Sequence, residues 1–241
     1  RVEEFVKRLD ADFYTGVPDS LLSPLGNYLM ENYGISSKHI IGTNEGNCVG
    51  MAAGHYLATG NVPVVYMQNS GIGNSINPVA SLLNKQVYGI PCIFVIGWRG
   101  KKGVKDEPQH LFQGEITQQL LDDLQIRNYI ISKATTLFEL DEIINEGKLY
   151  LGEGNSIAYI IEKDALEYQS QIQYSNCYTI NRELAIEKII KVSEKDVVIA
   201  TTGKISRELF EARERMKISH CYDFLTVGSM GHSSSIALKI A

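Results

Sequence analysis

Three continuous apolar runs constrain the fold of this chain more than any other feature of its sequence. They cover residues 62–67, 91–96 and 156–162, and helical patterns lie between them. A strand that is apolar along its whole length is expected to be covered on both faces, as in a parallel sheet with helices on each side. Connections of that kind are right-handed crossovers. The sequence therefore predicts an α/β fold with a doubly wound parallel sheet.

Shorter signals predict where the domains begin and end. Apolar spacing predicts helices over residues 2–9, 20–32, 45–58, 74–83, 112–124 and 137–150, and short strands over 12–15 and 39–42. The periodicity stops at residue 163 and resumes with helices over 181–192 and 206–216 and strands over 196–201 and 219–223. This pattern predicts a first domain over residues 1–165, a linker over 166–178, and the beginning of a second, similar domain over 179–241.

The composition excludes several classes of function. A hydrophobic content of 44% with 21% charged residues is typical of a globular protein with a full core. The net charge of −5 argues against a general nucleic-acid-binding surface, and no apolar run reaches the length of a membrane span. The four cysteines are isolated within or beside apolar segments, which indicates reduced thiols in a cytoplasm rather than a disulfide framework or a zinc site.

A glutamate and a glycine-rich turn follow two of the strand signals. Glu45 stands in the first turn of a helix behind Asn44, where the helix dipole favours any carboxylate by roughly 0.3–1 kcal/mol. Residues 68–75 would present backbone amides and several polar side chains at a strand-to-helix turn that contains Gly71 and Gly73. This turn matches neither the three-glycine dinucleotide pattern nor a P-loop. Taken alone, each pattern is more typical of an ordinary helix start or a tight turn.

The helix that Glu45 begins contains three glycines, Gly46, Gly50 and Gly54. A glycine inside a helix costs about 1 kcal/mol relative to alanine, so three of them need a compensating reason. Close approach of a partner subunit is one candidate reason.

A cluster of cations follows the strand over residues 91–96. Arg99, Lys101, Lys102 and Lys105 would project from the carboxyl end of the sheet, where ligands bind in open α/β folds. Four cations within seven residues suit a phosphate, phosphonate or sulfonate, and they suit a solvated loop at least as well. Histidine titrates near neutrality, so His110 could act as a general acid or base, or cap the helix that follows it.

Two segments of the second domain are also suited to a ligand. Residues 201–207 combine a strand end, a glycine, a helix start and hydroxyl groups, a pattern that suits a phosphate. Residues 228–231 place a methionine between two glycines, and methionine is most often a gap-filler in a core.

Five segments together resemble the phosphonopyruvate and sulfopyruvate decarboxylases, a family of thiamin-diphosphate (ThDP) enzymes. They are Gly-Val-Pro-Asp-Ser at 16–20, Thr-Asn-Glu-Gly-Asn at 43–47, Gln-Asn-Ser-Gly-Ile-Gly-Asn at 68–74, Asp-Glu-Pro-Gln-His at 106–110 and Thr-Gly-Lys-Ile-Ser-Arg-Glu-Leu at 202–209. The resemblance implies a pyrimidine-binding domain, a diphosphate-binding domain and at least a homodimer, because such sites form between subunits. It implies decarboxylation of 3-phosphonopyruvate to phosphonoacetaldehyde and CO₂. Sulfopyruvate decarboxylation and a non-catalytic anion-binding module are the alternatives.

The same resemblance implies roles for individual residues. Glu45 would hydrogen-bond N1′ of the aminopyrimidine, and His110 would assist the protonation that precedes product release. The Gly228 carbonyl would accept from the 4′-amino group, and Met230 would hold the cofactor bent. Further cofactor contacts are expected at Gln68, Asn69, Gly71, Asn74, Thr202, Gly203 and Ser206, and substrate contacts at Ser70, Arg99, Lys101 and Lys105.

The family's metal signature, Gly-Asp-Gly, does not occur in these residues. No metal ligand is therefore predicted up to Ala241, and the ligands of Mg²⁺, a cation that binds oxygen atoms, are expected beyond it in a longer protein.

Overall fold

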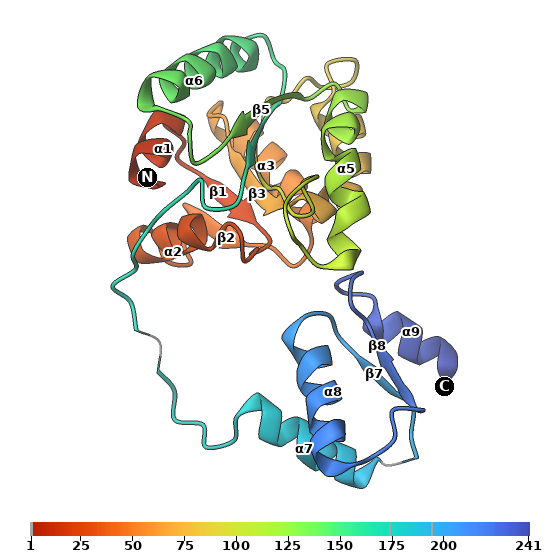
Figure 1. The fold of residues 1–241 in the computed structure, drawn as a ribbon. Helices are drawn as coiled ribbons and strands as arrows, with labels where there is room; N and C mark the ends of the chain where they lie inside the picture. Colours follow the sequence, from red (N-terminus) through yellow and green to blue (C-terminus); the bar gives the residue numbers. More distant parts are fainter. Residues whose placement is uncertain (1, 174, 194) are drawn as a thin grey trace. The chain divides into compact units, whose positions relative to one another are not determined.

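A parallel sheet of six strands organises the first 172 residues (Figure 1). In the computed structural model, which describes residues 2–173, 175–193 and 195–241, the strand order is β2-β1-β3-β4-β6-β5. The register pairs Gln68 with Gly97 and Gly97 with Ile161 at the carboxyl ends of three neighbouring strands. The predicted α/β fold with a doubly wound parallel sheet is confirmed. The strands are β1 Tyr14–Gly16, β2 His39–Ile41, β3 Val64–Gln68, β4 Ile93–Gly97, β5 Arg127–Ile131 and β6 Ile157–Ile161.

Helices cover both faces of this sheet (Figure 1). Along β3, Val64 and Tyr66 pack into one core with α1, α2 and α6, whereas Val65 and Met67 pack into the other with α3, α4 and α5. Because successive side chains of a strand point to opposite faces, this arrangement explains why the strand sequences are apolar throughout. The helices are α1 Val2–Leu9, α2 Ser23–Asn32, α3 Glu45–Thr59, α4 Ile72–Pro78, α5 Pro108–Asp123 and α6 Leu137–Gly152.

Several elements of this unit differ from the sequence prediction. The edge strand β5 was not predicted, because only Ile131 in it is buried. The helix predicted over residues 74–83 begins at Ile72 and changes after Pro78 into a π-helical turn, Val79–Leu83. Helix α5 begins at Pro108 rather than at residue 112, since proline fits the first helical position without losing a hydrogen bond.

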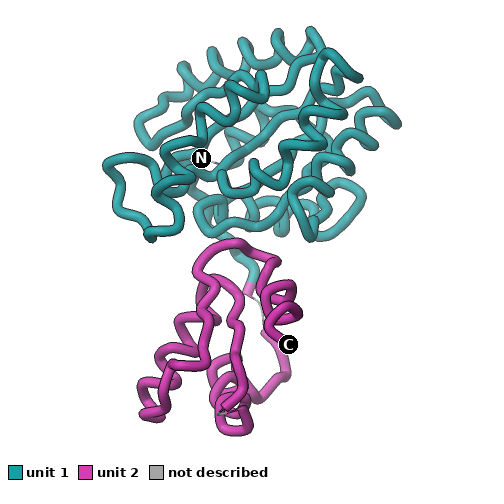
Figure 2. Tube along the Cα trace, turned by 90° about the vertical axis from the view of Figure 1, so that its right-hand side faces the viewer, with its two compact units in different colours: residues 1–172 teal, residues 173–241 magenta. Residues whose placement is uncertain are grey.

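The chain divides into two compact units, residues 1–172 and 173–241 (Figure 2). Part of the predicted linker belongs to the first unit, because Leu166 is buried in its core. Beyond it, the Tyr168 hydroxyl, the Ser170 hydroxyl and the Gln171 backbone N–H all donate to the Glu31 carboxylate on α2. Three donors on one carboxylate hold this segment against α2.

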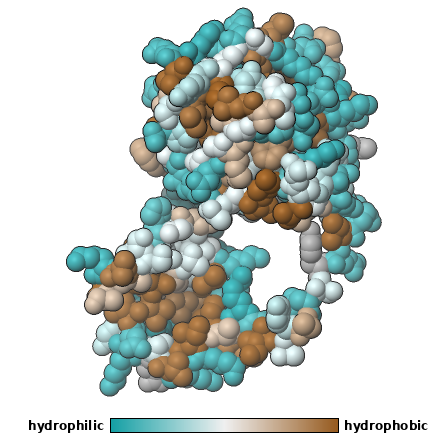
Figure 3. Space-filling model, turned by 180° about the vertical axis from the view of Figure 1, so that it is seen from behind, coloured by the Kyte–Doolittle hydropathy of each residue, from teal (hydrophilic) through white to brown (hydrophobic). Residues whose placement is uncertain are grey.

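The second unit contains a pair of parallel strands, β7 and β8, with three helices. Its core is small and is built around Ile190, Ala200, Leu209 and Ala212. Apolar side chains gather on its surface (Figure 3), and Val192 and Leu238 are 84% and 80% exposed. The elements are α7 Arg182–Val192, β7 Val198–Ala200, α8 Lys204–Met216, β8 Asp223–Leu225 and α9 Ser233–Ile240.

Strand β8 lies later than the predicted strand over residues 219–223. The Ser219 hydroxyl accepts from the Cys221 N–H and the His220 carbonyl accepts from the Asp223 N–H, so these residues form a turn. The strand then begins at Asp223, whose carboxylate is paired with the fully buried Arg213 of α8. Among the described residues, no helix is long and apolar enough to cross a membrane.

Candidate functional site

The predicted site residues of the first unit gather at the carboxyl edge of its sheet. Glu45 begins α3 after β2, Gln68 ends β3, and Arg99 follows β4 by two residues. The strand order places β1 and β3 between β2 and β4, so these ends are neighbours. In open α/β sheets ligands bind at this edge, where the direction of strand order reverses.

Glu45 is almost fully buried at the start of α3, with 7% of its surface exposed. Asn44 caps the helix by accepting a hydrogen bond from the Gly46 N–H at 2.8 Å, which fixes the backbone on which Glu45 stands. The Asn74 side chain donates from Nδ2 to Glu45 Oε2 at 2.8 Å. The carboxylate is therefore both shielded from water and held in one orientation.

Two glycines allow α3 and the start of α4 to approach each other. A Cβ atom added at Gly71 would lie 2.6 Å from Glu45 Cγ and 2.7 Å from its Oε1. A Cβ atom added at Gly46 would lie 2.7 Å from the backbone oxygen of Asn74. Contacts under 3.0 Å essentially never occur for real Cβ atoms, so both positions require glycine for this packing. Gly71, predicted as a cofactor contact, thus also provides the space that Glu45 occupies.

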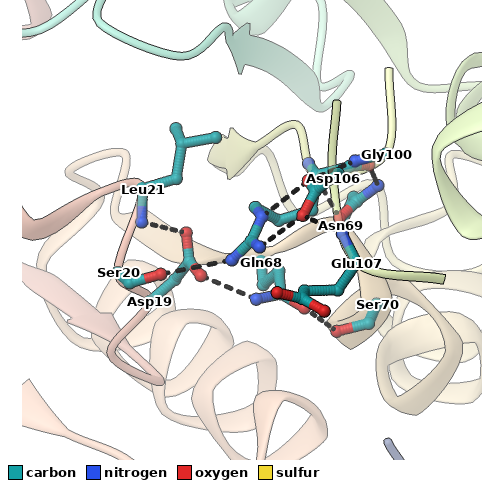
Figure 4. A network of polar contacts seen from close by, with 10 residues as sticks. Asp19, Ser20, Leu21, Gln68, Asn69, Ser70, Gly100, Asp106 and Glu107 are labelled. Carbon is teal, nitrogen blue, oxygen red and sulfur yellow. Dashed lines mark hydrogen bonds and ion pairs between the residues drawn. The ribbon is translucent and has the colours of Figure 1, made fainter. Parts of the chain in front are cut away.

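A polar network joins the ends of β3 and β4 to the loop that follows β1 (Figure 4). Gln68 donates from Nε2 to Asp19 Oδ1 at 2.7 Å, and the Ser70 hydroxyl donates to Gln68 Oε1 at 2.8 Å. The second oxygen of Asp19 accepts from the backbone N–H groups of Leu21 and Leu22, at 3.0 and 3.2 Å. These bonds fix the Asp19 carboxylate over the end of β4.

Arg99 is held by Asp106 in a two-pronged ion pair, with Nε–Oδ2 and Nη2–Oδ1 distances of 2.8 and 2.5 Å. The Gly100 N–H also donates to Asp106 Oδ2, and Arg99 Nη1 donates to the Ser20 hydroxyl (Figure 4). The Arg99 guanidinium holds the pKa of the Asp106 carboxyl well below its usual range, and Asp106 raises the pKa of Arg99. Two-pronged pairs of this kind are geometrically specific and strong.

His110 is half-buried in the first turn of α5. Burial and the nearby Arg99 lower its pKa, while Asp106, Asp19 and Glu107 oppose that shift. The charges that act on its imidazole are thus those of the polar network. A lowered pKa leaves the ring neutral at pH 7, so it is able to accept a proton there.

Two of the predicted anion-binding cations, Arg99 and Lys101, have acidic partners. Arg99 is paired with Asp106, and Lys101 pairs with Glu162 at the end of β6 while lying 5.4 Å from the Trp98 ring centroid. Lys105 is exposed. Acidic partners therefore compensate two of the cations in this loop.

Asn69, predicted as a cofactor contact, is fully buried and makes structural contacts. Its Nδ2 donates to the Arg99 carbonyl and to the Thr117 hydroxyl, both at 2.8 Å, and its Oδ1 accepts from the Arg99 N–H at 3.3 Å. These bonds tie the end of β3 to the loop after β4 and to α5. A role for the Asn69 side chain in direct ligand contact is not compatible with this arrangement.

In the second unit, the predicted residues lie around the start of α8. Gly203 precedes the helix with a φ of +82°, a conformation that favours glycine. The Thr202 hydroxyl donates to the Val227 carbonyl at 2.7 Å, which places the end of β7 next to Gly228, and Ser206 donates to the Thr201 carbonyl. Met230 is 58% exposed rather than packed in a core. Two of the hydroxyl groups are therefore already bonded to backbone oxygens.

Two acidic residues of the site were not predicted as site residues, although both belong to the quoted segments. The Asp19 carboxylate accepts from the Leu21 backbone N–H and from the Gln68 side chain. Asp106 precedes His110 by four residues in the Asp-Glu-Pro-Gln-His segment. Its proximity to the cations of the same loop was the available signal. In the described residues, no cluster of three or more His, Cys, Asp and Glu side chains could hold a metal ion.

The comparisons agree with this architecture. Residues 2–121 match the model of the thiamine pyrophosphate enzyme, N-terminal TPP binding domain. Phosphonopyruvate decarboxylase of Streptomyces viridochromogenes is 31% identical and aligns with 94% of this chain and 58% of its own length. A second, from Streptomyces hygroscopicus, is 30% identical with the same coverage.

A shorter relative is covered more completely. Sulfopyruvate decarboxylase subunit alpha of Methanocaldococcus jannaschii is 35% identical over 61% of this chain and 81% of its own length. By contrast, the chain spans about 58% of the length of the two Streptomyces relatives. The chain belongs to the thiamine pyrophosphate enzymes, in the family of the phosphonopyruvate and sulfopyruvate decarboxylases.

Proposed function

We propose that this chain is part of a ThDP-dependent decarboxylase that converts 3-phosphonopyruvate to phosphonoacetaldehyde and CO₂. The observation that carries the proposal is the buried carboxylate of Glu45, held by Asn74 at the carboxyl edge of the sheet. Relatives named phosphonopyruvate decarboxylase that align with 94% of the chain support the substrate. Residues 1–165 would then bind the pyrimidine, and residues 179–241 would begin the diphosphate-binding domain.

The residues present fit the cofactor. Glu45 Oε1 has no hydrogen-bond partner among the described residues, and 7% of the residue's surface stays exposed, so we expect that a ring nitrogen can reach it. Glu45 would hold N1′ of the aminopyrimidine, and Gly71, Gln68 and Asn74 would surround that ring. When bound, the cofactor supplies a thiazolium ring that accepts the electron pair left by departing CO₂.

Residues of the second unit would bind the diphosphate part of a cofactor molecule. Thr202, Gly203 and Ser206 would lie at its diphosphate, where the start of α8 favours an anion. Gly228 would accept from the 4′-amino group, and the exposed Met230 would support the bend between the rings.

His110 and the loop after β4 would act on the substrate. A neutral imidazole whose pKa is lowered by burial and Arg99 suits proton exchange at the reacting carbon. Arg99, Lys101, Lys105 and Ser70 would meet the phosphonate. Because Asp106 already holds Nε and Nη2 of Arg99, a doubly charged substrate would approach the guanidinium from the side of Nη1, which Asp106 leaves open.

The decisive experiment measures CO₂ release by the whole protein with ThDP and Mg²⁺. We expect turnover of phosphonopyruvate that is lost in Glu45→Gln and kept in Glu115→Gln, a control at an exposed glutamate of α5. Equal turnover in Glu45→Gln and the wild type would refute the role of Glu45. Sulfopyruvate measured in parallel distinguishes the second candidate, which the sulfopyruvate decarboxylase subunits from methanogenic archaea support. A higher kcat/KM for sulfopyruvate would overturn the proposed substrate.

We also propose that the active protein is a homo-oligomer. From Gly46 to Asn84 the sequence has no Asp, Glu, Lys or Arg, although charged residues make up 21% of the chain. This segment exposes Gly50 and Gly54, whose added Cβ atoms would meet open space, and Leu57 is 74% exposed on the same helix face. The centres of protein interfaces are depleted of charge, and these glycines have no steric purpose within the chain.

Sedimentation of two variants tests this interface. Gly54→Glu places a charge in the proposed contact and should shift the protein toward monomers. Gly26→Glu is the matched control, because Gly26 also faces open space but lies on α2. A wild type that sediments as a monomer would refute the proposal.

Because Cys48, Cys92, Cys177 and Cys221 are all free thiols, we further propose that the protein works in the reducing cytoplasm.

A further inference from the structure

The hydrogen bond between Asn74 and Glu45 divides the two oxygens of the carboxylate. Oε2 accepts from Asn74 Nδ2 at 2.8 Å, and this is the one hydrogen bond that reaches the Glu45 carboxylate from the described residues. Oε1 has no partner among them, and 7% of the Glu45 surface stays exposed. The two oxygens of one buried carboxylate thus have different environments.

Close packing on two glycines holds the Glu45 side chain and the Asn74 backbone in place. Glu45 lies against Gly71, where an added Cβ atom would be 2.6–2.8 Å from three atoms of its side chain. A Cβ atom added at Gly46, the residue after Glu45, would lie 2.7 Å from the Asn74 carbonyl oxygen. Glu45 therefore packs on Gly71, which lies three residues before Asn74. The Asn74 backbone packs on Gly46, which directly follows Glu45. Because the backbones of both residues are held in place, the hydrogen bond from Asn74 determines the orientation of the Glu45 carboxylate.

We propose that Asn74 is a positioning residue, which occupies Oε2 of Glu45 and thereby leaves Oε1 as the oxygen that meets the ring nitrogen of a bound aminopyrimidine. This inference rests on the proposed function, because it assigns a task to Glu45 in cofactor binding. It also changes the role expected for Asn74, from a direct cofactor contact to a residue that acts through Glu45. Asparagine suits the task, because its amide donates without adding a charge beside the carboxylate.

Removal of the amide should release the carboxylate from its orientation. In Asn74→Ala, Oε2 loses its donor, and the carboxylate is free to rotate so that neither oxygen is aimed at the ligand. Misplacement of a catalytic group by about 1 Å can cost on the order of 100-fold in rate. We therefore expect kcat to fall about 10- to 100-fold and the Kd of ThDP to rise, while the KM of the oxo acid stays within about twofold.

The matched control is Asn77→Ala. Asn77 lies one turn later on α4, and its side chain is exposed. This variant loses the same chemical group from the same helix, so it should keep the wild-type kcat and Kd. A general weakening of α4 would instead affect both variants alike.

A second variant, Asn74→Asp, has nearly the same shape and serves if Asn74→Ala does not fold. It sets two carboxylates within hydrogen-bond distance, an arrangement that requires a proton between them. Its activity should therefore be low at neutral pH and recover partly as the pH falls, a pH profile that a merely structural role of Asn74 would not produce.

The test combines three measurements on the whole protein: calorimetric titration with ThDP and Mg²⁺, the pH dependence of kcat, and a crystal structure of the cofactor-free Asn74→Ala variant. We expect weaker ThDP binding and a rotated Glu45 carboxylate. An unmoved Glu45 side chain with wild-type Kd and kcat would overturn the inference. If the wild type decarboxylates neither substrate, the proposed function fails, but the Kd of ThDP and the Glu45 conformation still decide whether Asn74 positions the carboxylate.

Discussion

The packing between Gly71 and Glu45 predicts a large difference between two neighbouring glycine substitutions. Gly71→Ala introduces a Cβ atom 2.6 Å from Glu45 Cγ, whereas ordinary van der Waals contact begins at 3.4 Å. The Glu45 side chain or the turn before α4 must then move by about 0.8 Å, the difference between these distances. At Gly73, two residues later, an added Cβ atom would meet nothing within 4 Å.

The expected free energies of unfolding follow from these contacts. Overpacking of a well-packed site typically costs about 1–3 kcal/mol. Both substitutions also reduce the freedom of the unfolded chain, which stabilises the protein by about 0.4–1 kcal/mol where the native backbone tolerates alanine. Gly71 has a φ of −70°, so its backbone allows the substitution and only the contact opposes it. We therefore expect Gly71→Ala to destabilise by about 1–2 kcal/mol and Gly73→Ala to stabilise by up to about 1 kcal/mol.

Urea unfolding followed by tryptophan fluorescence measures both values. The chain has a single tryptophan, Trp98, which follows β4 and donates from Nε1 to the Gly114 carbonyl, so its emission reports on the unit that contains both glycines. The two variants serve as controls for each other, since the chemical change is identical. Equal stabilities of Gly71→Ala and Gly73→Ala would show that Glu45 does not pack against Gly71 as described.

Three further predictions concern buried polar groups. His39 is fully buried and desolvation lowers its pKa, so its contribution to stability is present above about pH 6.5 and is lost as the pH falls; His39→Gln should flatten this dependence in urea titrations. Asp223→Asn leaves the buried Arg213 without its counter-charge and should destabilise the second unit by about 3–5 kcal/mol, measured by hydrogen exchange. Iodoacetamide should label the exposed Cys221 well before Cys92, which is buried and has a raised thiol pKa; equal labelling rates would contradict the burial.

The sequence predicted the central strands of the sheet better than the edge strand β5. The central strands were identifiable because burial on both faces makes them apolar throughout, as in β3 and β4. Strand β5 lies at the edge and buries only Ile131, so no continuous apolar run marked it. The same limit applies to β8, which is short and only half-buried. Local periodicity reports burial, and it weakens where tertiary contacts cover one side only.

The site residues were predictable as a group, but their partners were not. Glu45 was marked by its place in a helix start, whereas its contact with Asn74 joins residues 29 positions apart. The Gln68–Asp19 bond spans 49 positions, so no local pattern indicates it. Asn69 illustrates the consequence, since a polar residue in a glycine-rich turn was predicted to contact a ligand and instead connects β3 to α5. Residue types that suit a chemical role can be recognised in the local sequence, but the hydrogen-bond partner of each group depends on the fold.

The pairing of charges at the sheet edge bears directly on how an anionic substrate would be recognised. A free cluster of cations would attract any phosphate-like anion. Here Asp106 holds Arg99 with two hydrogen bonds and also accepts from the Gly100 N–H, which keeps the guanidinium in one orientation. An anion that binds Arg99 must therefore approach the face that Asp106 leaves open, near the Ser20 hydroxyl. A phosphonate and a sulfonate present similar oxygens and differ in their protonation state, so a single paired guanidinium gives little basis for distinguishing them. For this reason the comparison of the two oxo acids, rather than the number of cations in the loop, is the measurement that assigns the substrate.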